Sequence, residues 1–297
     1  MATAPIIDRQ LLEKLERLAI RWQRSFRGLV GGHNASKYAG PGQEFLDHRN
    51  FHPGDDLRAV NWRAYMRLEK LFLKLFQVEP RTPIRILLDT STSMVAGEDD
   101  GAITKFDYAR KLAAALVYIG LVRHDTIMLQ PFDAHLQDPV IATGGRHRFG
   151  PISDFLSALQ PAEKTNYFEM ARQFISAYTR PGLLILLSDY LDDGDCLRPL
   201  QYLADFGHEL MLVQLWTDDD RDPEWDGDVA LVDLESGGKL EIALDPDSRR
   251  AYTAAFDKYS DAIQQLALRN GGRYVGLSTS TPLDEAVFQA VTRTGAA

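Results

Sequence analysis

Hydrophobic positions along the chain alternate between short apolar runs and longer stretches in which apolar residues recur every three or four positions. The first pattern is typical of strands buried in a parallel sheet and the second of amphipathic helices. The strands predicted in this way are 72–78, 84–88, 126–132, 139–143, 183–188, 210–216 and 273–277, with a hairpin formed by 229–233 and 239–243. The predicted helices are 8–29, 105–123, 152–159, 167–178, 197–206, 249–270 and 283–293. Their alternation predicts an α/β fold, a doubly wound, mostly parallel sheet with helices on both faces.

The helix expected at 8–29 carries an apolar stripe beside a basic one. The apolar stripe consists of Leu11, Leu15, Leu18 and Trp22, and the basic one of Lys14, Arg17, Arg21 and Arg24. A basic amphipathic helix packs on its own domain or lies on a partner or membrane surface. The sequence leaves both alternatives open.

Charge is spread unevenly over the chain, whose formal net charge is −9. Residues 1–83 hold 14 Lys and Arg against 9 Asp and Glu, whereas the remainder holds 19 against 33. The basic part has no recognised nucleic-acid motif. We therefore expect it to dock against acidic protein, including the chain's own C-terminal part.

Composition narrows the class of protein. A chain of 297 residues that is 45% hydrophobic can bury a full core. No stretch reaches the roughly 18 uninterrupted apolar residues of a membrane span, and residues 1–5 lead into charged residues without a signal-peptide core. The single cysteine, Cys196, excludes an intrachain disulfide and a multi-cysteine zinc site. We expect a cytoplasmic protein.

Small oxygen-bearing side chains gather where the strand 84–88 ends, in the order Asp89-Thr90-Ser91-Thr92-Ser93. In an open α/β sheet, ligands bind outside the carboxyl ends of the strands. Carboxylate and hydroxyl oxygens suit Mg²⁺, Mn²⁺ or Ca²⁺ better than zinc or copper. The structural alternative is a Ser/Thr-rich turn that caps the next helix and binds no metal.

Two later positions carry matching chemistry. Thr165 is expected in a loop at a helix start, and Asp189 directly follows a predicted buried strand. With Asp89, Ser91 and Ser93, this order resembles the metal-ion-dependent adhesion site of von Willebrand factor A domains. The resemblance implies direct ligation by the three hydroxyl side chains, with both aspartates acting mainly through bound waters. It also implies one open coordination position, typically filled by a carboxylate from a binding partner.

The segment ahead of the central strand adds a more specific resemblance. The patterns E-F-x-x-x-R (44–49) and G-D-D-x-R-x-[IV]-x-W (54–62) precede D-x-S-x-S. This arrangement resembles domain of unknown function 58, a bacterial family with a von Willebrand A-like domain that is commonly encoded beside MoxR-type AAA+ ATPases. Asn61 and Phe51 depart from the usual Asp and Tyr of the family. Many relatives also carry two membrane helices near the N-terminus, which this sequence does not show.

The resemblance implies a von Willebrand factor A-like domain at 83–297, with an N-terminal helix and a small β-containing segment at 1–82 packed on it. In that segment we expect a folded knot of ion pairs among Arg49, Arg58, Asp55 and Asp56. The expected function is a non-enzymatic, metal-dependent protein-interaction module. It would act as an adaptor or co-chaperone of a MoxR-type AAA+ ATPase in protein complex maturation, holding a divalent cation, foremost Mg²⁺, with Mn²⁺ or Ca²⁺ as alternatives.

Sequence motifs typical of enzyme active sites are largely missing. A phosphotransferase of the haloacid-dehalogenase type needs a second acid where this chain has Ser91. The sequence has no G-x-S-x-G elbow, Walker loop or H-E-x-x-H motif, and its seven histidines show no ligand spacing. The alternative function is a metal-dependent hydrolase that uses the same cation to activate water. The acidic stretch 217–228, expected to be a solvated loop, is an alternative calcium site that lacks EF-hand spacing.

Overall fold

The chain divides into two compact units in the computed structural model. The larger unit comprises Met1–Phe26 and Thr82–Ala297, and the smaller comprises Arg27–Arg81. The residues that the structure describes are 6–26, 37–39, 44–53, 55, 57, 60–77, 84–95, 103–191, 194–223, 227–232 and 239–292. All five predicted metal-site residues lie in the larger unit.

Six strands form the central sheet of the larger unit. In sheet order they are β11 (Arg273–Ser278), β8 (Glu209–Trp216), β7 (Leu183–Ser188), β4 (Ile84–Asp89), β5 (Thr126–Phe132) and β6 (Val140–Thr143). Every neighbouring pair is parallel except β5 with β6, which lies at an edge. This architecture confirms the expected fold class, a von Willebrand factor A-like doubly wound, mostly parallel sheet.

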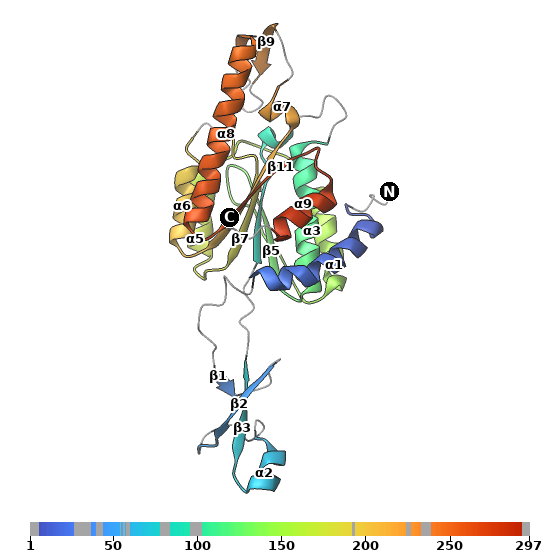
Figure 1. The fold of residues 1–297 in the computed structure, drawn as a ribbon, viewed down its shortest axis with the longest axis vertical. Helices are drawn as coiled ribbons and strands as arrows, with labels where there is room; N and C mark the ends of the chain where they lie inside the picture. Colours follow the sequence, from blue (N-terminus) through green and yellow to red (C-terminus); the bar gives the residue numbers. More distant parts are fainter. Residues whose placement is uncertain are drawn as a thin grey trace. The chain divides into compact units, whose positions relative to one another are not determined.

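Helices cover both faces of this sheet, as Figure 1 shows. One face is covered by α1 (Arg9–Phe26), α3 (Lys105–Val122), α4 (Phe149–Ala158) and α9 (Leu283–Thr292). The other face is covered by α5 (Tyr167–Ala177), α6 (Leu197–Asp205) and α8 (Pro246–Arg269). Among the described residues, no helix is both long and apolar enough to cross a bilayer.

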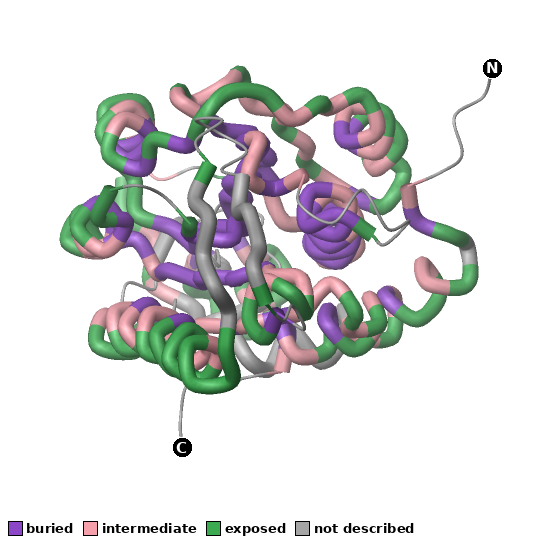
Figure 2. The backbone as a smooth tube through the Cα atoms, turned by 90° about the horizontal axis from the view of Figure 1, so that it is seen from above, coloured by how far each residue is buried: buried purple, intermediate pink, exposed green. Residues whose placement is uncertain are grey.

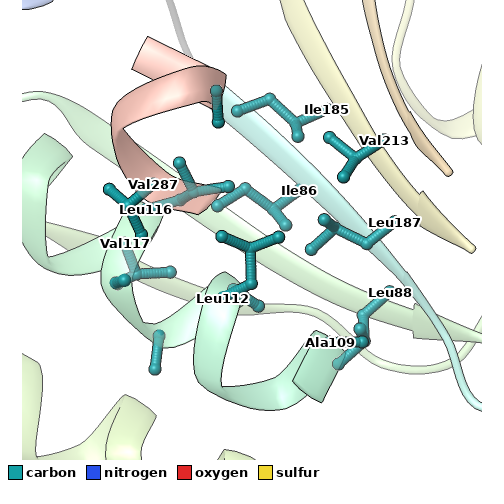
Figure 3. Packing of buried hydrophobic residues seen from close by; sticks show 14 of the residues in the cluster. Ile86, Leu88, Ala109, Leu112, Leu116, Val117, Ile185, Leu187, Val213 and Val287 are labelled. Carbon is teal, nitrogen blue, oxygen red and sulfur yellow. The ribbon is translucent and has the colours of Figure 1, made fainter. Parts of the chain in front are cut away.

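Helix α3 is buried on nearly all sides. Its Leu112 and Leu116 interleave with Ile86 of β4 and Ile185 of β7, as Figure 3 shows. Its alanines are also fully buried, because α1, α4 and α9 pack against the sides of α3 that the sheet does not cover. Figure 2 shows the resulting concentration of buried positions in the inner strands and on the inward sides of the helices. Because α3 is enclosed in this way, its sequence is apolar nearly throughout and does not show the polar face of an amphipathic helix.

Helix α1 packs on its own unit. Leu15 is fully buried in the core that α1 shares with α3 and α9. On its polar side, Lys14 Nζ lies 2.8 Å from a carboxylate oxygen of Asp284 in α9, and Glu16 accepts a 2.8 Å hydrogen bond from the Tyr118 hydroxyl. Leu11, Leu15 and Leu18 of the apolar stripe therefore meet the core, while the basic side chain at position 14 pairs with a surface carboxylate.

The described residues of the smaller unit form an antiparallel three-stranded sheet and a short helix. The strands, in sheet order, are β1 (Lys37–Ala39), β3 (Phe72–Gln77) and β2 (Glu44–Asn50), and the helix is α2 (Trp62–Leu68). Asn61 caps α2 by accepting the Ala64 N–H, as the usual aspartate could also do.

Part of the expected ion-pair knot is visible in this unit. Arg49 donates two hydrogen bonds to Asp55, at 2.9 and 2.6 Å, and the same carboxylate accepts the His52 N–H. The other members of the knot, Asp56 and Arg58, lie outside the described residues. The packing of this segment on the larger unit stays a prediction.

Several elements differ from the sequence expectation: β1, β2 and α2 were not predicted, α4 starts at Phe149 rather than 152, and side-chain caps account for two further differences in the larger unit. The acidic stretch 217–228 is not wholly a loop, because Thr217 forms a capping box with Asp220 and starts the helical turn α7 (Asp218–Arg221). Helix α8 begins at Pro246 rather than at residue 249, since Asp245 caps it by accepting the Ser248 N–H and proline fits the first helical position. The predicted hairpin forms from β9 (Gly227–Val232) and β10 (Lys239–Leu244), with its turn outside the described residues.

Candidate metal centre

The candidate site begins at the carboxyl end of β4. Asp89, the last residue of that strand, is fully buried, and its Oδ1 accepts the Ser91 N–H at 2.9 Å. A 3₁₀ turn at Thr92–Val95 follows, and the Ser91 and Ser93 hydroxyls lie 3.0 Å apart. Ser91 is fully buried whereas Ser93 is half-buried. The D-x-S-x-S stretch therefore gathers one carboxylate and two hydroxyls, with Ser93 on the side open to solvent.

Thr165 reaches this cluster because its loop is held against the β4 loop. Thr92 donates both its N–H and its hydroxyl to the carbonyl oxygen of Glu163, at 3.0 and 2.8 Å. Glu163 itself has a positive φ of 51°, which turns the chain back toward β4. As a result the Thr165 hydroxyl lies 3.4 Å from Asp89 Oδ1 and is almost fully buried.

Two residues that the sequence did not single out also contact Asp89. Leu88 pairs with Leu187 across β4 and β7, so that Ser188 is level with Asp89. The Ser188 hydroxyl donates to Asp89 Oδ2 at 2.5 Å, and the Tyr167 hydroxyl lies 2.5 Å from the same Ser188 oxygen. A serine ending a buried strand is the signal that could have identified Ser188, whereas the tyrosine looked like an ordinary core residue.

Asp189 lies beside the cluster but is already paired. Its Oδ1 accepts the Leu191 N–H at 3.0 Å, and its Oδ2 accepts a 2.8 Å hydrogen bond from Lys105 Nζ. The same ammonium lies 3.3 Å from Asp220 Oδ2 in α7. We call Lys105, Asp189 and Asp220 the buried triad. Lys105 was not predicted, because nothing in the sequence distinguishes it from a lysine in the exposed first turn of a helix.

The two buried carboxylates, Asp89 and Asp189, have different electrostatic surroundings. Burial and the neighbouring charge of Asp189 raise the pKa of Asp89 to about 7, although hydrogen bonds from Ser188 and Ser91 oppose the shift. Burial lowers the pKa of Lys105, but Asp189 and Asp220 outweigh it, so that its pKa is raised overall and the ammonium stays charged. No lysine, arginine or histidine in the described part of the chain forms an ion pair with Asp89.

The donor set fits a hard divalent cation. Asp89, Ser91, Ser93 and Thr165 supply only oxygen atoms, as Mg²⁺, Mn²⁺ and Ca²⁺ prefer. A buried carboxylate without a cationic partner is costly unless a positive charge is supplied. The described residues contain no group of three or more His, Cys, Asp or Glu side chains able to hold a metal ion, so the site would depend on its hydroxyls. The assignment of the five ligands stays a prediction.

The acidic stretch that offered an alternative calcium site has partners of its own. Asp218 accepts hydrogen bonds from the Ser278 and Ser280 hydroxyls, Asp220 belongs to the buried triad, and Asp222 pairs with Arg249. A cavity of about 490 Å³ lies beside this stretch, lined by Trp216, Asp218, Asp219, Arg221, Asp222, Gly276, Ser278 and Thr281. None of the five predicted ligands lines that cavity.

The raised pKa of Asp89 gives a testable pH dependence. The pKa of Asp89 in the folded protein lies above the ordinary value of an aspartate, 3.8, so the folded protein holds the proton more tightly than the unfolded chain. The protonated Asp89 therefore contributes stability that is fully present below pH about 4 and is lost as pH rises through about 7. Each pKa unit corresponds to about 1.4 kcal/mol, so the loss is on the order of a few kcal/mol.

Thermal melts of wild type and Asp89→Asn in EDTA, from pH 4 to 8, measure this contribution as the difference between the two proteins. We expect the melting temperature of Asp89→Asn to rise relative to that of wild type as pH increases across this range. Above pH 7, Mg²⁺ should restore the stability of wild type. Parallel pH profiles of the two proteins would contradict the assignment.

The chain is similar in sequence to a protein family and to curated relatives. The family described as "Protein of unknown function DUF58" matches residues 47–262. Uncharacterized proteins of Mycobacterium tuberculosis and Mycobacterium bovis are 27% identical over 263 residues, which cover 86% of this chain and 80% of each relative.

Similar solved structures include the conserved hypothetical protein BatB from Bacteroides thetaiotaomicron. Its TM-score is 0.42 at 14% identity, and the match covers 71% of this chain and 97% of BatB. The SpRpn10 VWA domain has a TM-score of 0.38 at 11% identity, covering 70% of this chain and 94% of that domain. Because the family match spans well over half of the sequence, the chain belongs to the DUF58 family of proteins of unknown function.

Proposed function

We propose that this chain is a non-enzymatic, cation-dependent protein-interaction module. Its Asp89 site holds a divalent cation, most favourably Mg²⁺, with Ser91, Ser93 and Thr165 as the other protein donors. When bound, the cation supplies a positive charge with a coordination position open to a carboxylate of a partner. The observation that carries the proposal is the fully buried Asp89, which has hydroxyl and N–H partners but no ion-pair partner among the described residues.

The surroundings of the site support a protein partner. Three large apolar side chains are exposed within three residues of site or triad residues: Phe168 is 68% exposed, Ile103 46% and Leu191 38%. Phe168 follows Thr165 at the start of α5, and Leu191 follows Asp189. Apolar side chains left in water around a polar centre are a common feature of protein interaction sites.

The resemblance to the DUF58 family is the support for a specific class of partner. Its members are commonly encoded beside MoxR-type AAA+ ATPases, and we propose that such an ATPase or its client supplies the carboxylate. The module would then act as an adaptor or co-chaperone in the maturation of a protein complex. Because the ATPase consumes ATP, the expected compartment is the cytoplasm.

Binding to the purified ATPase encoded nearest to this gene tests the proposal. We expect an affinity at least tenfold higher in Mg²⁺ than in EDTA, because a loaded site gains a carboxylate–cation contact worth more than about 1.4 kcal/mol. Surface-bound ATPase in an optical binding assay provides the measurement. Asp89→Asn should bind equally weakly in both buffers, while the matched control Asp219→Asn, an exposed carboxylate of α7, should behave as wild type.

Equal affinity in Mg²⁺ and EDTA would contradict a cation-dependent interface. Turnover of phosphate esters or peptides by the Mn²⁺-loaded protein, abolished in Asp89→Asn, would instead establish the metal-dependent hydrolase.

A further inference from the structure

Lys105 is a fully charged side chain in an almost completely buried position. It is 1% exposed, and its ammonium lies 2.8 Å from Asp189 Oδ2 and 3.3 Å from Asp220 Oδ2. Removing a charge from water costs several kcal/mol unless its partners are well placed. The three members come from different parts of the chain: the first residue of α3, the residue after β7, and the helical turn α7. A buried triad of this kind fixes the position of each charge next to the Asp89 cluster.

The triad changes what Asp189 can offer to a cation. Both of its carboxylate oxygens are occupied, Oδ1 by the Leu191 N–H and Oδ2 by Lys105. Asp220 is likewise held, because its Oδ2 also accepts the Thr217 N–H at 2.8 Å within the capping box. When every group is ionised, the three carboxylates and one ammonium in and around the site carry a net charge of −2. A divalent cation balances that charge, whereas loss of the ammonium would leave −3.

Resting on the function proposed above, we propose that Lys105 is a positioning residue that acts as a tethered counter-ion for the metal site. It holds Asp189 away from direct ligation and lowers the negative potential at Asp89. Asp220 anchors Lys105 in that position. The bound cation consequently has Asp89 as its nearest protein charge and keeps positive charge for the carboxylate of a partner. The site binds its cation less tightly than its acidic residues alone would allow.

Two substitutions change the net charge of the triad in opposite directions, and we expect opposite effects on the affinity for Mn²⁺. Lys105→Met keeps a long apolar stem and removes the positive charge, so Mn²⁺ should bind on the order of tenfold more tightly or better. Asp220→Asn removes one negative charge and keeps a side-chain oxygen, while Asp189 still holds Lys105 at 2.8 Å, so Mn²⁺ should bind on the order of tenfold more weakly. Asp220 is partly exposed, which makes this variant compatible with folding. Asp219→Asn is the control, with unchanged affinity expected, because its side chain is exposed and outside the triad.

Calorimetric titration of the full-length chain with Mn²⁺ measures these affinities, and thermal melts over a Mn²⁺ series supply a second readout. Lys105→Met should melt below wild type in EDTA and recover as Mn²⁺ is added, because the cation replaces the missing charge. A purely structural ion pair would instead lower the melting temperature by the same amount at every Mn²⁺ concentration. If Lys105→Met does not fold in EDTA, the weakening expected in Asp220→Asn decides the question.

The outcomes separate the two proposals. Wild type that binds Mn²⁺, with Lys105→Met unchanged or weaker, overturns the role of Lys105 and leaves the proposed function intact. Binding by Lys105→Met alone supports the tethered counter-ion and overturns a resident cation in wild type. Absence of binding in both proteins overturns both proposals.

Discussion

Asp89→Asn is expected to abolish divalent cation binding, lowering affinity for Mg²⁺ and Mn²⁺ by at least about 100-fold. The substitution keeps the size of the side chain but removes the only carboxylate of the site that is not already paired with Lys105. A lost charge–cation contact in a buried site is worth well over the roughly 2.7 kcal/mol that a 100-fold change represents. Calorimetric titration with Mn²⁺ measures the effect directly.

The same variant should be more stable than wild type in EDTA at pH 8. Wild type must keep an uncompensated buried carboxylate ionised there, since the pKa of Asp89 is raised to about 7. Asp89→Asn would thus lose cation binding and become more stable in the absence of metal. This combination distinguishes a metal site from a structural cap, because loss of a cap lowers stability. Wild-type Mn²⁺ affinity in Asp89→Asn would place the metal elsewhere, and Asp219→Asn tests the acidic stretch as that place.

Leu15→Ala is expected to cost about 2–5 kcal/mol of unfolding free energy, the range for large-to-small changes in a packed core. Leu15 is fully buried where α1 meets α3 and α9, and α3 begins with Lys105 of the buried triad. In a unit of this size the loss corresponds to a fall in melting temperature on the order of 10 °C. Thermal or urea melts of the full-length chain provide the measurement.

Arg17→Ala is the matched control for this substitution. Arg17 lies on the exposed side of the same helix, and we expect its loss to shift stability only slightly. Near-equal melting of Leu15→Ala and wild type would mean that α1 does not contribute to the core of the larger unit. The basic helix would then be available to a partner or membrane surface, as the sequence alone allowed.

Sequence pattern by itself determined most of the fold of the larger unit. The apolar runs that became β4 and β7 are short and flanked by polar residues, so burial on both faces of a parallel sheet is the arrangement that satisfies them. Asp89, Ser91 and Ser93 are also close in the sequence, and the 3₁₀ turn at Thr92–Val95 that follows the strand folds them toward one another. Where the pattern was misread, as at Thr217 and Asp245, a local side-chain cap extended a helix into a stretch that composition had marked as loop.

Tertiary structure alone decided which charges meet. Lys105 and Asp189 are 84 residues apart in the chain, and only the packing of α3 against the sheet brings them to 2.8 Å. The same holds for Ser188, which reaches Asp89 because of the register between β4 and β7. Coulomb energies and hydrogen bonds depend on separation in space, whereas periodicity reports only which residues are buried. The sequence therefore predicted carboxylates and hydroxyls for the candidate site, and the fold determined that Asp189 pairs with a lysine while Asp89 does not.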